Sequence, residues 1–160
     1  MNKSNIVIIL ARKKSKRIKN KNLIKIFNKP LICHSIETAL ESNLINSIYV
    51  SSDSEEIEKI TKKYNINFIK RPSKLCRSTS TSEDALEHAI KIIQKKINLD
   101  NIVFLQPTSP LRPKNIIDLS LKFFYNKKAD SLFSSSLFVN HIWEKDQNSL
   151  KPINYNYKKR

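Results

Sequence analysis

Basic side chains crowd a short segment near the N-terminus, directly after an apolar run. Most residues from Arg12 to Asn22 are Lys or Arg, and they follow the continuous apolar segment Ile6 to Ala11. A run of like charge beside a buried strand is unfavourable unless an anion neutralises it. The segment therefore predicts a polyphosphate site, with a solvated loop as the alternative.

Three later segments carry polar groups that could complete such a site. Arg71 precedes Pro72, which restricts it to an extended conformation and so directs its side chain. The stretch 78–82 brings hydroxyl groups to the start of a predicted helix, where they could bind a phosphate or base carbonyl, or cap the helix. The loop 106–112 holds an amide, hydroxyls and a guanidinium between prolines. A stiff polar loop of this kind predicts a binding function.

Alternating strands and helices position these segments. Apolar runs predict strands over residues 5–10, 47–51, 67–70 and 101–105, and a further extended segment over 130–139. This order predicts an α/β fold, a three-layer sandwich with a mostly parallel sheet, in one domain spanning residues 1–160. Ligands of open α/β sheets bind beyond the carboxyl ends of the strands, where the polar segments stand.

Capping patterns set the expected helix boundaries. Pro30 opens a helix that ends at residues 42–43, and Asp53 has the position of an N-cap for a helix reaching residues 64–65. Ser80 and Glu83 form a predicted capping box before a third helix. Pro113 suits the first turn of a fourth helix.

Glycine is absent from the chain, although average usage of about 7% would place roughly 11 glycines in a chain of this length. Walker-type loops, dinucleotide-binding fingerprints and glycine nucleophile elbows are therefore excluded. Asparagine is the next best residue at positive φ. We expect Asn28, Asn43, Asn65 and Asn126 to replace glycine in turns.

The formal net charge is +16, from 30 Lys and Arg against 14 Asp and Glu. Such a balance favours an acidic partner, but the excess is spread along a chain rich in Lys, Ile and Asn, as A/T-rich codons would produce. A non-catalytic basic module that binds nucleotides or nucleic acid is the alternative function. Nucleic acid is the weaker expectation, because aromatic residues are not interleaved with the basic ones.

Cysteine usage and hydropathy predict a soluble cytoplasmic protein. Cys33 and Cys76 lack metal-ligand spacing, which favours a reducing compartment over a disulfide framework. The apolar run 6–11 is too short for a signal sequence, and no run approaches the 18 residues of a membrane span. We expect no membrane association.

Several motifs together resemble the acylneuraminate cytidylyltransferases, which make CMP-activated nonulosonic acids. They are residues 8–22, 28–32, 50–53, 71–72 and 105–112, in the right order over residues 5 to about 143. The resemblance implies a fold like that of nucleotide-diphospho-sugar transferases. Residues 129–133, 142–144 and 151–155 resemble the bacterial branch acting on legionaminic- or pseudaminic-type sugars.

The resemblance implies a reaction in which an acidic nine-carbon sugar attacks the α-phosphorus of CTP and pyrophosphate leaves. Arg12 and Lys21 would be catalytic and hold the triphosphate, with Mg²⁺ as the expected cofactor. The nucleotide-binding residues would be Leu10, Ala11, Arg12, Ser15, Lys16, Lys21, Asn22, Arg71 and Ser82, and Gln106 would face the sugar acid.

Two departures from the family pattern bear on activity. Lys13 and Lys14 stand where the family has small residues. Family members are homodimers that continue past the position of Arg160 into a dimerisation arm and metal-binding aspartates, so we expect a C-terminally truncated chain and assign no metal ligand. Impaired turnover, or an inactive remnant, is the corresponding alternative. Asp53 is a carboxylate at the end of a predicted strand, but its sequence pattern also fits the N-cap of the following helix.

Overall fold

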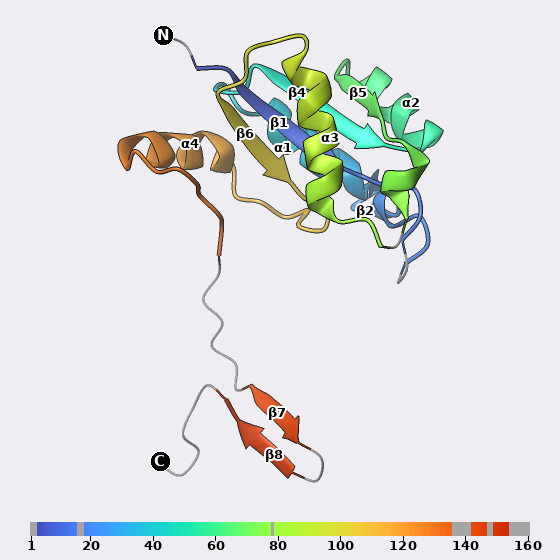
Figure 1. The fold of residues 1–160 in the computed structure, drawn as a ribbon, viewed down its shortest axis with the longest axis vertical. Helices are drawn as coiled ribbons and strands as arrows, with labels where there is room; N and C mark the ends of the chain where they lie inside the picture. The colour runs from blue at the N-terminus through green and yellow to red at the C-terminus, as the bar shows by residue number, and fades with distance from the viewer. Residues whose placement is uncertain (1–2, 16–17, 78, 136–141, 147–148, 154–160) are drawn as a thin grey trace. The chain divides into compact units, whose positions relative to one another are not determined.

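The computed structural model describes residues 3–15, 18–77, 79–135, 142–146 and 149–153. The chain divides into two compact units, Met1–Ala129 and Asp130–Arg160 (Figure 1). The prediction of one domain over the whole chain stays a prediction. Within the described part of the chain, no helix combines the length and the apolarity that crossing a bilayer requires.

A four-stranded parallel sheet forms the centre of the first unit, in the order β5-β4-β1-β6. Its strands are β1 (Asn5–Leu10), β4 (Ser47–Ser52), β5 (Asn67–Lys70) and β6 (Asn101–Leu105). β1 is central, with Ile6 opposite Ser47 on one side and Ile102 on the other. Residues 6–9 of β1 are fully buried, which explains why the strand lacks polar alternation. All four strand predictions are confirmed.

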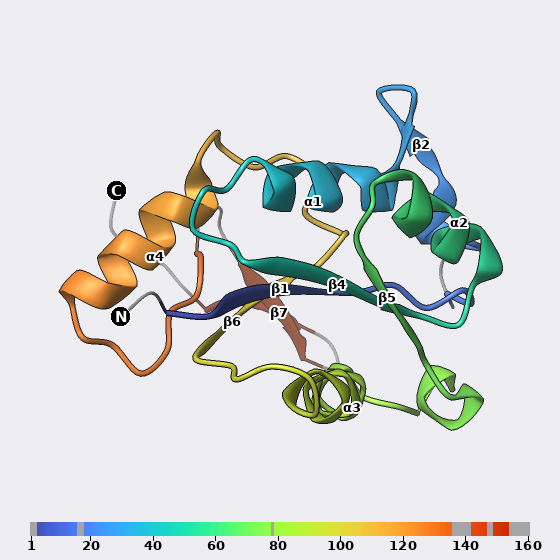
Figure 2. The same ribbon diagram turned by 90° about the horizontal axis from the view of Figure 1, so that it is seen from above.

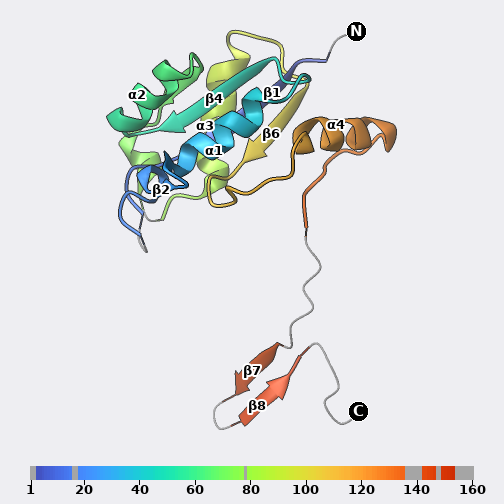
Figure 3. The ribbon, with the colours of Figure 1, turned by 180° about the vertical axis from the view of Figure 1, so that it is seen from behind.

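Helices cover both faces of this sheet (Figure 2). On one face, α1 (Leu31–Leu40), α2 (Glu55–Lys63) and α4 (Ile116–Asn126) pack against side chains of β1 and β4. On the other, α3 (Ser82–Gln94) buries Ala89 and Ile93. Figure 3, from the opposite side, shows α1 lying across β1 and β4. The predicted three-layer α/β sandwich is confirmed.

Three of the predicted helix starts are wrong by one or more residues. Ser54, not Asp53, caps α2, because the Ser54 hydroxyl accepts the N–H of Ile57 at 3.4 Å. The capping box of α3 pairs Thr81 with Asp84, at 3.1 Å in both directions, instead of Ser80 with Glu83. In both helices neighbouring residues have similar capping chemistry, so spacing alone could not select the right pair.

The fourth helix also begins later than its proline predicts. α4 starts at Ile116, and its N-cap, Asn115, adopts a left-handed conformation at φ 59°. Pro113 therefore lies in the loop before the helix, where its carbonyl accepts the N–H of Ile116 at 3.3 Å.

Positive φ angles occur without any glycine. Among the described residues they belong to Asn20, Phe27, Asn28, Asn65, Asn115 and Lys128. Asn28 and Asn65 are confirmed as glycine replacements. The predictions for Asn43 and Asn126 are wrong, because neither residue has a positive φ. Asn126 is still helical, and the left-handed residue after α4 is Lys128.

Short elements that sequence periodicity did not predict surround the sheet. They are the 3₁₀ turns η1 (Lys21–Leu23) and η2 (Ser73–Cys76), and the hairpin of β2 (Lys25–Ile26) with β3 (Lys29–Pro30). Phe27 and Asn28 turn this hairpin with positive φ at both positions, as two-residue hairpin turns require.

The second unit contains the antiparallel hairpin of β7 (Trp143–Asp146) and β8 (Ser149–Pro152), in which Trp143 pairs with Pro152. The extended segment predicted over 130–139 forms no strand in residues 131–135, and its end lies outside the described residues.

Candidate functional site

A pocket of about 220 Å³ opens beyond the carboxyl ends of β1, β5 and β6. β1 lies where the strand order reverses, because β4 and β5 lie on one side of it and β6 lies on the other. This point is the usual ligand crevice of open α/β sheets. The pocket is lined by Leu10, Arg12, Ser15, Lys21, Asn22, Arg71, Leu75, Ser80, Thr81, Ser82, Phe104, Gln106, Pro107 and Thr108.

Most of the predicted site residues therefore meet in one place. Leu10, Arg12, Ser15, Lys21, Asn22, Arg71, Ser82 and Gln106 all line the pocket. Ala11 does not, because it is buried and its N–H donates to the carbonyl of Ser51 at 3.0 Å. Lys16 lies outside the described residues. The roles assigned to these residues stay predictions.

Arg71 is a buried cation, only 6% exposed. Its Nε donates to the Ser51 hydroxyl at 3.1 Å and its Nη2 to the Ser51 carbonyl at 2.7 Å. Burial lowers the pKa of Arg71, but a guanidinium stays charged at neutral pH. Within the described part of the chain, no carboxylate forms an ion pair with Arg71. The nearby charge of Asp53 raises the pKa of Arg71, but the effect of burial outweighs it. A buried charge without an ion-pair partner is unfavourable, which favours an electron-rich ligand in the pocket.

Arg12 and Asn22 join the segments around the pocket. Arg12 donates from Nη1 to the carbonyl of Arg77 at 3.0 Å, which connects the loop after β1 to the end of η2. The side-chain amide of Asn22 donates to the Arg12 carbonyl at 3.1 Å. Lys21 precedes Asn22 in η1 and brings a third cation to the pocket wall.

The loop after β6 is held from outside the pocket by Arg112. Its Nη2 donates to the Gln106 carbonyl at 2.7 Å, and its Nη1 donates to the hydroxyl of the buried Ser35 in α1 at 3.0 Å. The N–H of Ser109 also donates to the Gln106 carbonyl, at 3.2 Å. These bonds fix the backbone of Gln106, whose neighbours Pro107 and Thr108 line the pocket.

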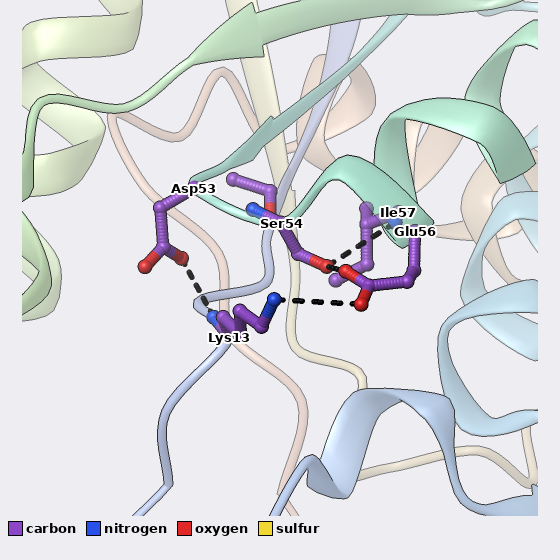
Figure 4. Close-up of polar contacts among 6 residues, drawn as sticks. Lys13, Asp53, Ser54, Glu56 and Ile57 are labelled. Atoms are coloured by element: carbon purple, nitrogen blue, oxygen red, sulfur yellow. Dashed lines mark hydrogen bonds and ion pairs between the residues drawn. The ribbon is translucent and has the colours of Figure 1, made fainter.

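Lys13 is directed to the flank of the site (Figure 4). Its backbone N–H donates to Oδ1 of Asp53 at 2.6 Å, and its ammonium lies 3.4 Å from Oε1 of Glu56. The Ser54 hydroxyl donates to the same Glu56 carboxylate at 2.6 Å, and hydrogen bonds from Ser54, the helix backbone and Lys13 lower the pKa of Glu56 to about 2. Lys13 is thus absent from the pocket lining despite its place in the first loop.

The described residues do not form a metal site. No group of three or more His, Cys, Asp or Glu side chains gathers among them, and the described pocket lining contains no carboxylate. Asp53, the nearby acid, already accepts the N–H of Lys13. These residues alone do not suit a protein-held Mg²⁺, so no step of the reaction is routed through one.

Six lining residues were not among the predicted site residues. Ser80, Thr81 and Thr108 belong to polar segments that the sequence had marked, so their hydroxyl groups were the available signal. Leu75, Phe104 and Pro107 are apolar. Apolar residues at a pocket wall look the same in a sequence as apolar residues in a core, and only the path of η2 and β6 distinguishes them.

Comparison with known proteins agrees with this geometry. Residues 6–155 match the cytidylyltransferase family. The chain belongs to this family. It is 38% identical over 137 residues to the pseudaminic acid cytidylyltransferase of Campylobacter jejuni, covering 84% of this chain and 59% of that protein. It is 34% identical over 119 residues to the N-acylneuraminate cytidylyltransferase of Escherichia coli, covering 74% of this chain and 28% of that protein.

The chain thus spans about three fifths or less of these two relatives. Among solved structures, 4-diphosphocytidyl-2C-methyl-D-erythritol synthase superposes with a TM-score of 0.75 at 11% identity, covering 96% of this chain and 70% of the other. CMP:2-keto-3-deoxy-manno-octonic acid synthetase, solved with CTP, gives a TM-score of 0.64 at 22% identity, covering 79% and 49%. These two structures share the fold with the cytidylyltransferase chain.

Proposed function

We propose that this chain binds CTP in the pocket and transfers CMP to a nonulosonic sugar acid with release of pyrophosphate. The observation that carries the proposal is the lining of the pocket. Arg12 and Lys21 reach it from the connection after β1 and Arg71 reaches it from the end of β5, and no described lining residue is acidic. A ligand with several negative charges neutralises these cations. A nucleoside triphosphate supplies such charges together with a base.

In the proposed reaction, the anomeric hydroxyl of the sugar acid attacks the α-phosphorus. A bond forms between that oxygen and phosphorus, the hydroxyl proton is released to solvent, and the bond from phosphorus to the oxygen bridging to the β-phosphate breaks. Arg12 and Lys21 stabilise the charge that grows on the leaving pyrophosphate, with Ser15 beside them. Their main contribution is positioning and electrostatic stabilisation, as in other phosphoryl-type transfers.

The remaining lining residues divide between nucleoside and sugar in this proposal. Arg71 and Asn22 contact the cytidine part, Ser82 also lies on the nucleotide, and the backbone at Leu10 lies beside the base. Gln106 faces the sugar acid from the other side of the pocket. The relatives named for pseudaminic acid support an acceptor of the pseudaminic type, and a legionaminic-type acceptor stays a prediction. Mg²⁺ stays a prediction, as a partner that the triphosphate itself would bring.

The test is calorimetry with CTP, ATP and a short oligonucleotide at two salt concentrations. We expect selective CTP binding that is lost in the Arg71→Ala variant. Tight, steeply salt-dependent oligonucleotide binding without a preference for CTP would contradict the proposal and favour a basic nucleic-acid-binding module. Pyrophosphate release with CTP, Mg²⁺ and candidate nonulosonic acids then tests the transfer step. Selective CTP binding without release would favour an inactive remnant.

A further inference from the structure

Asp53 has a contact that neither helix capping nor metal binding explains. It follows β4 directly, and its Oδ1 accepts the backbone N–H of Lys13 at 2.6 Å (Figure 4). Ser54 performs the capping of α2, so the Asp53 carboxylate is not needed for that helix. A hydrogen bond to a charged acceptor is roughly twice as strong as a neutral one. The carboxylate therefore restrains the first loop at the residue after Arg12.

Asp53 also lies close to the opposite wall of the pocket. Burial and then the nearby charge of Asp53 raise the pKa of the Cys76 thiol in η2. The residue after Cys76 is Arg77, whose carbonyl accepts the Nη1 of Arg12 at 3.0 Å. Arg12 is thus held at two points, by its own side-chain bond to η2 and by the Lys13 bond to Asp53 next to it.

The bond to Asp53 also determines how phosphates can be held. Phosphate-binding loops commonly present backbone N–H groups, but the N–H of Lys13 is already engaged by Asp53. The Lys13 side chain is directed to Glu56 of α2 and does not line the pocket. The N–H of Lys13 is therefore not free to bind a phosphate, which leaves the side chain of the neighbouring Arg12 as the phosphate-binding group at this point of the loop. The orientation of the loop backbone then matters, because it directs Arg12.

We propose that Asp53 is a positioning residue, which fixes the first loop through the Lys13 N–H so that Arg12 faces the triphosphate. The role rests on the proposed function, since it concerns the same pocket. Asp53 acts through Arg12 and does not itself touch the nucleotide.

The test compares Asp53→Ala and Asp53→Asn with the wild-type chain. The dissociation constant for CTP is measured by calorimetry, without metal and with Mg²⁺, and thermal unfolding of each free chain is recorded. We expect Asp53→Ala to weaken CTP binding about tenfold under both conditions. Asp53→Asn should weaken it about threefold, because the amide oxygen still accepts a neutral hydrogen bond. This near-isosteric variant carries the test if the alanine variant does not fold.

Glu56→Gln is the matched control, since it removes the ion pair with the Lys13 ammonium and leaves the backbone bond to Asp53 intact. Its dissociation constant for CTP should stay within about twofold of wild type. A double-mutant cycle separates positioning from general structural damage. In an Arg12→Ala background, replacing Asp53 should change the CTP affinity by no more than about twofold, because the residue it positions is gone.

Three results would overturn this role while leaving the proposed function standing. The first is wild-type affinity in Asp53→Ala. The second is an equal loss with and without Arg12, which indicates a general structural effect. The third is a loss that appears only with Mg²⁺, which makes Asp53 a metal ligand. A wild-type chain with no selectivity for CTP instead overturns the proposed function, and this role with it.

Discussion

Cations on the outer surface and cations in the pocket have different surroundings. Lys29 of β3 pairs with Glu37 of α1, at 2.8 Å. Lys62 pairs with Glu58 within α2, and Lys91 with Glu87 within α3, at 2.8 and 2.6 Å. None of the described ion pairs includes Arg12, Lys21 or Arg71. Where the structure gives these pocket cations partners, as for Arg12 and Arg71, the partners are carbonyl and hydroxyl oxygens.

The net charge of the chain therefore says little about its ligand. Exposed lysine–glutamate pairs contribute about 0 to 1 kcal/mol each and leave no charge for a partner. Unpaired cations around a pocket leave positive charge that a ligand can neutralise, and partial burial strengthens that interaction. The location of the charge, rather than its sum, is what points to a nucleotide.

Replacing Arg71 should have the largest effect. Arg71→Ala removes a buried cation from the pocket, and we expect CTP binding to weaken about a hundredfold, roughly 3 kcal/mol. Calorimetry measures this loss, with Arg71→Lys as the control that keeps the charge but not the two bonds to Ser51. An alanine variant that binds CTP within twofold of wild type would show that buried and surface cations are equivalent here.

Lys21 should come next. Lys21→Ala is expected to weaken CTP binding about tenfold and to make its dependence on salt shallower, because one phosphate contact is lost. The matched control is Lys62→Ala, which removes a lysine paired with Glu58 on α2 and should leave the affinity unchanged. Equal losses in the two variants would mean that binding responds only to net charge.

Replacing Arg112 tests the role of a cation that fixes the pocket wall from outside the pocket. Arg112→Ala removes the bonds to the Gln106 carbonyl and to Ser35, so the Gln106 backbone is held less firmly, although the N–H of Ser109 still donates to its carbonyl. We expect the ratio of the affinity for a CMP-sugar to the affinity for CMP to fall about fivefold. The affinity for CTP should change less than about twofold. Calorimetry with CMP and the CMP-sugar measures both. A loss confined to CTP would place Arg112 with the phosphate-binding cations instead.

Glu37 should show the smallest effect. Burial alone would raise the pKa of Glu37, but hydrogen bonds from Lys29 and Tyr64 outweigh it and hold the pKa below the usual value. A lowered pKa adds stability above the unfolded pKa of about 4.3, and this is lost as the pH falls through the folded value. Urea unfolding of Glu37→Gln should therefore show a deficit below about 1 kcal/mol at pH 7 that shrinks towards pH 3. CTP affinity should not change.

The parts of the fold that carry strong periodicity could be predicted from the sequence. β1 is a run of β-branched residues that is apolar on both faces, and the structure buries it on both faces. Helix starts were less predictable, because Asp53 and Ser54 have nearly the same capping chemistry and the three-dimensional path selects between them. The hairpin of β2 and β3 has strands too short for a periodic pattern, and Phe27 is an unusual residue for its positive φ.

The residues of the candidate site could be predicted from the sequence more fully than their contacts. Arg12, Arg71 and Gln106 stand after different strands, and a parallel sheet brings the ends of its strands to one edge. Which atoms they contact could not be predicted, since the bonds from Arg71 to Ser51 and from Lys13 to Asp53 join segments far apart in the sequence. Sequence patterns report chemistry and local order, whereas such long-range pairings depend on how the layers pack.

The central place of β1 also determines when the sheet can be completed during synthesis. β1 is made first, but it pairs with β4 and with β6, and β6 ends only at Leu105. Until then, an apolar segment from Ile6 to Leu10 emerges from the ribosome without the partner on one of its sides. Long-range parallel pairing of this kind slows folding and leaves strand edges open to association. The strand order that creates the pocket therefore also leaves one edge of β1 open until β6 has been synthesised.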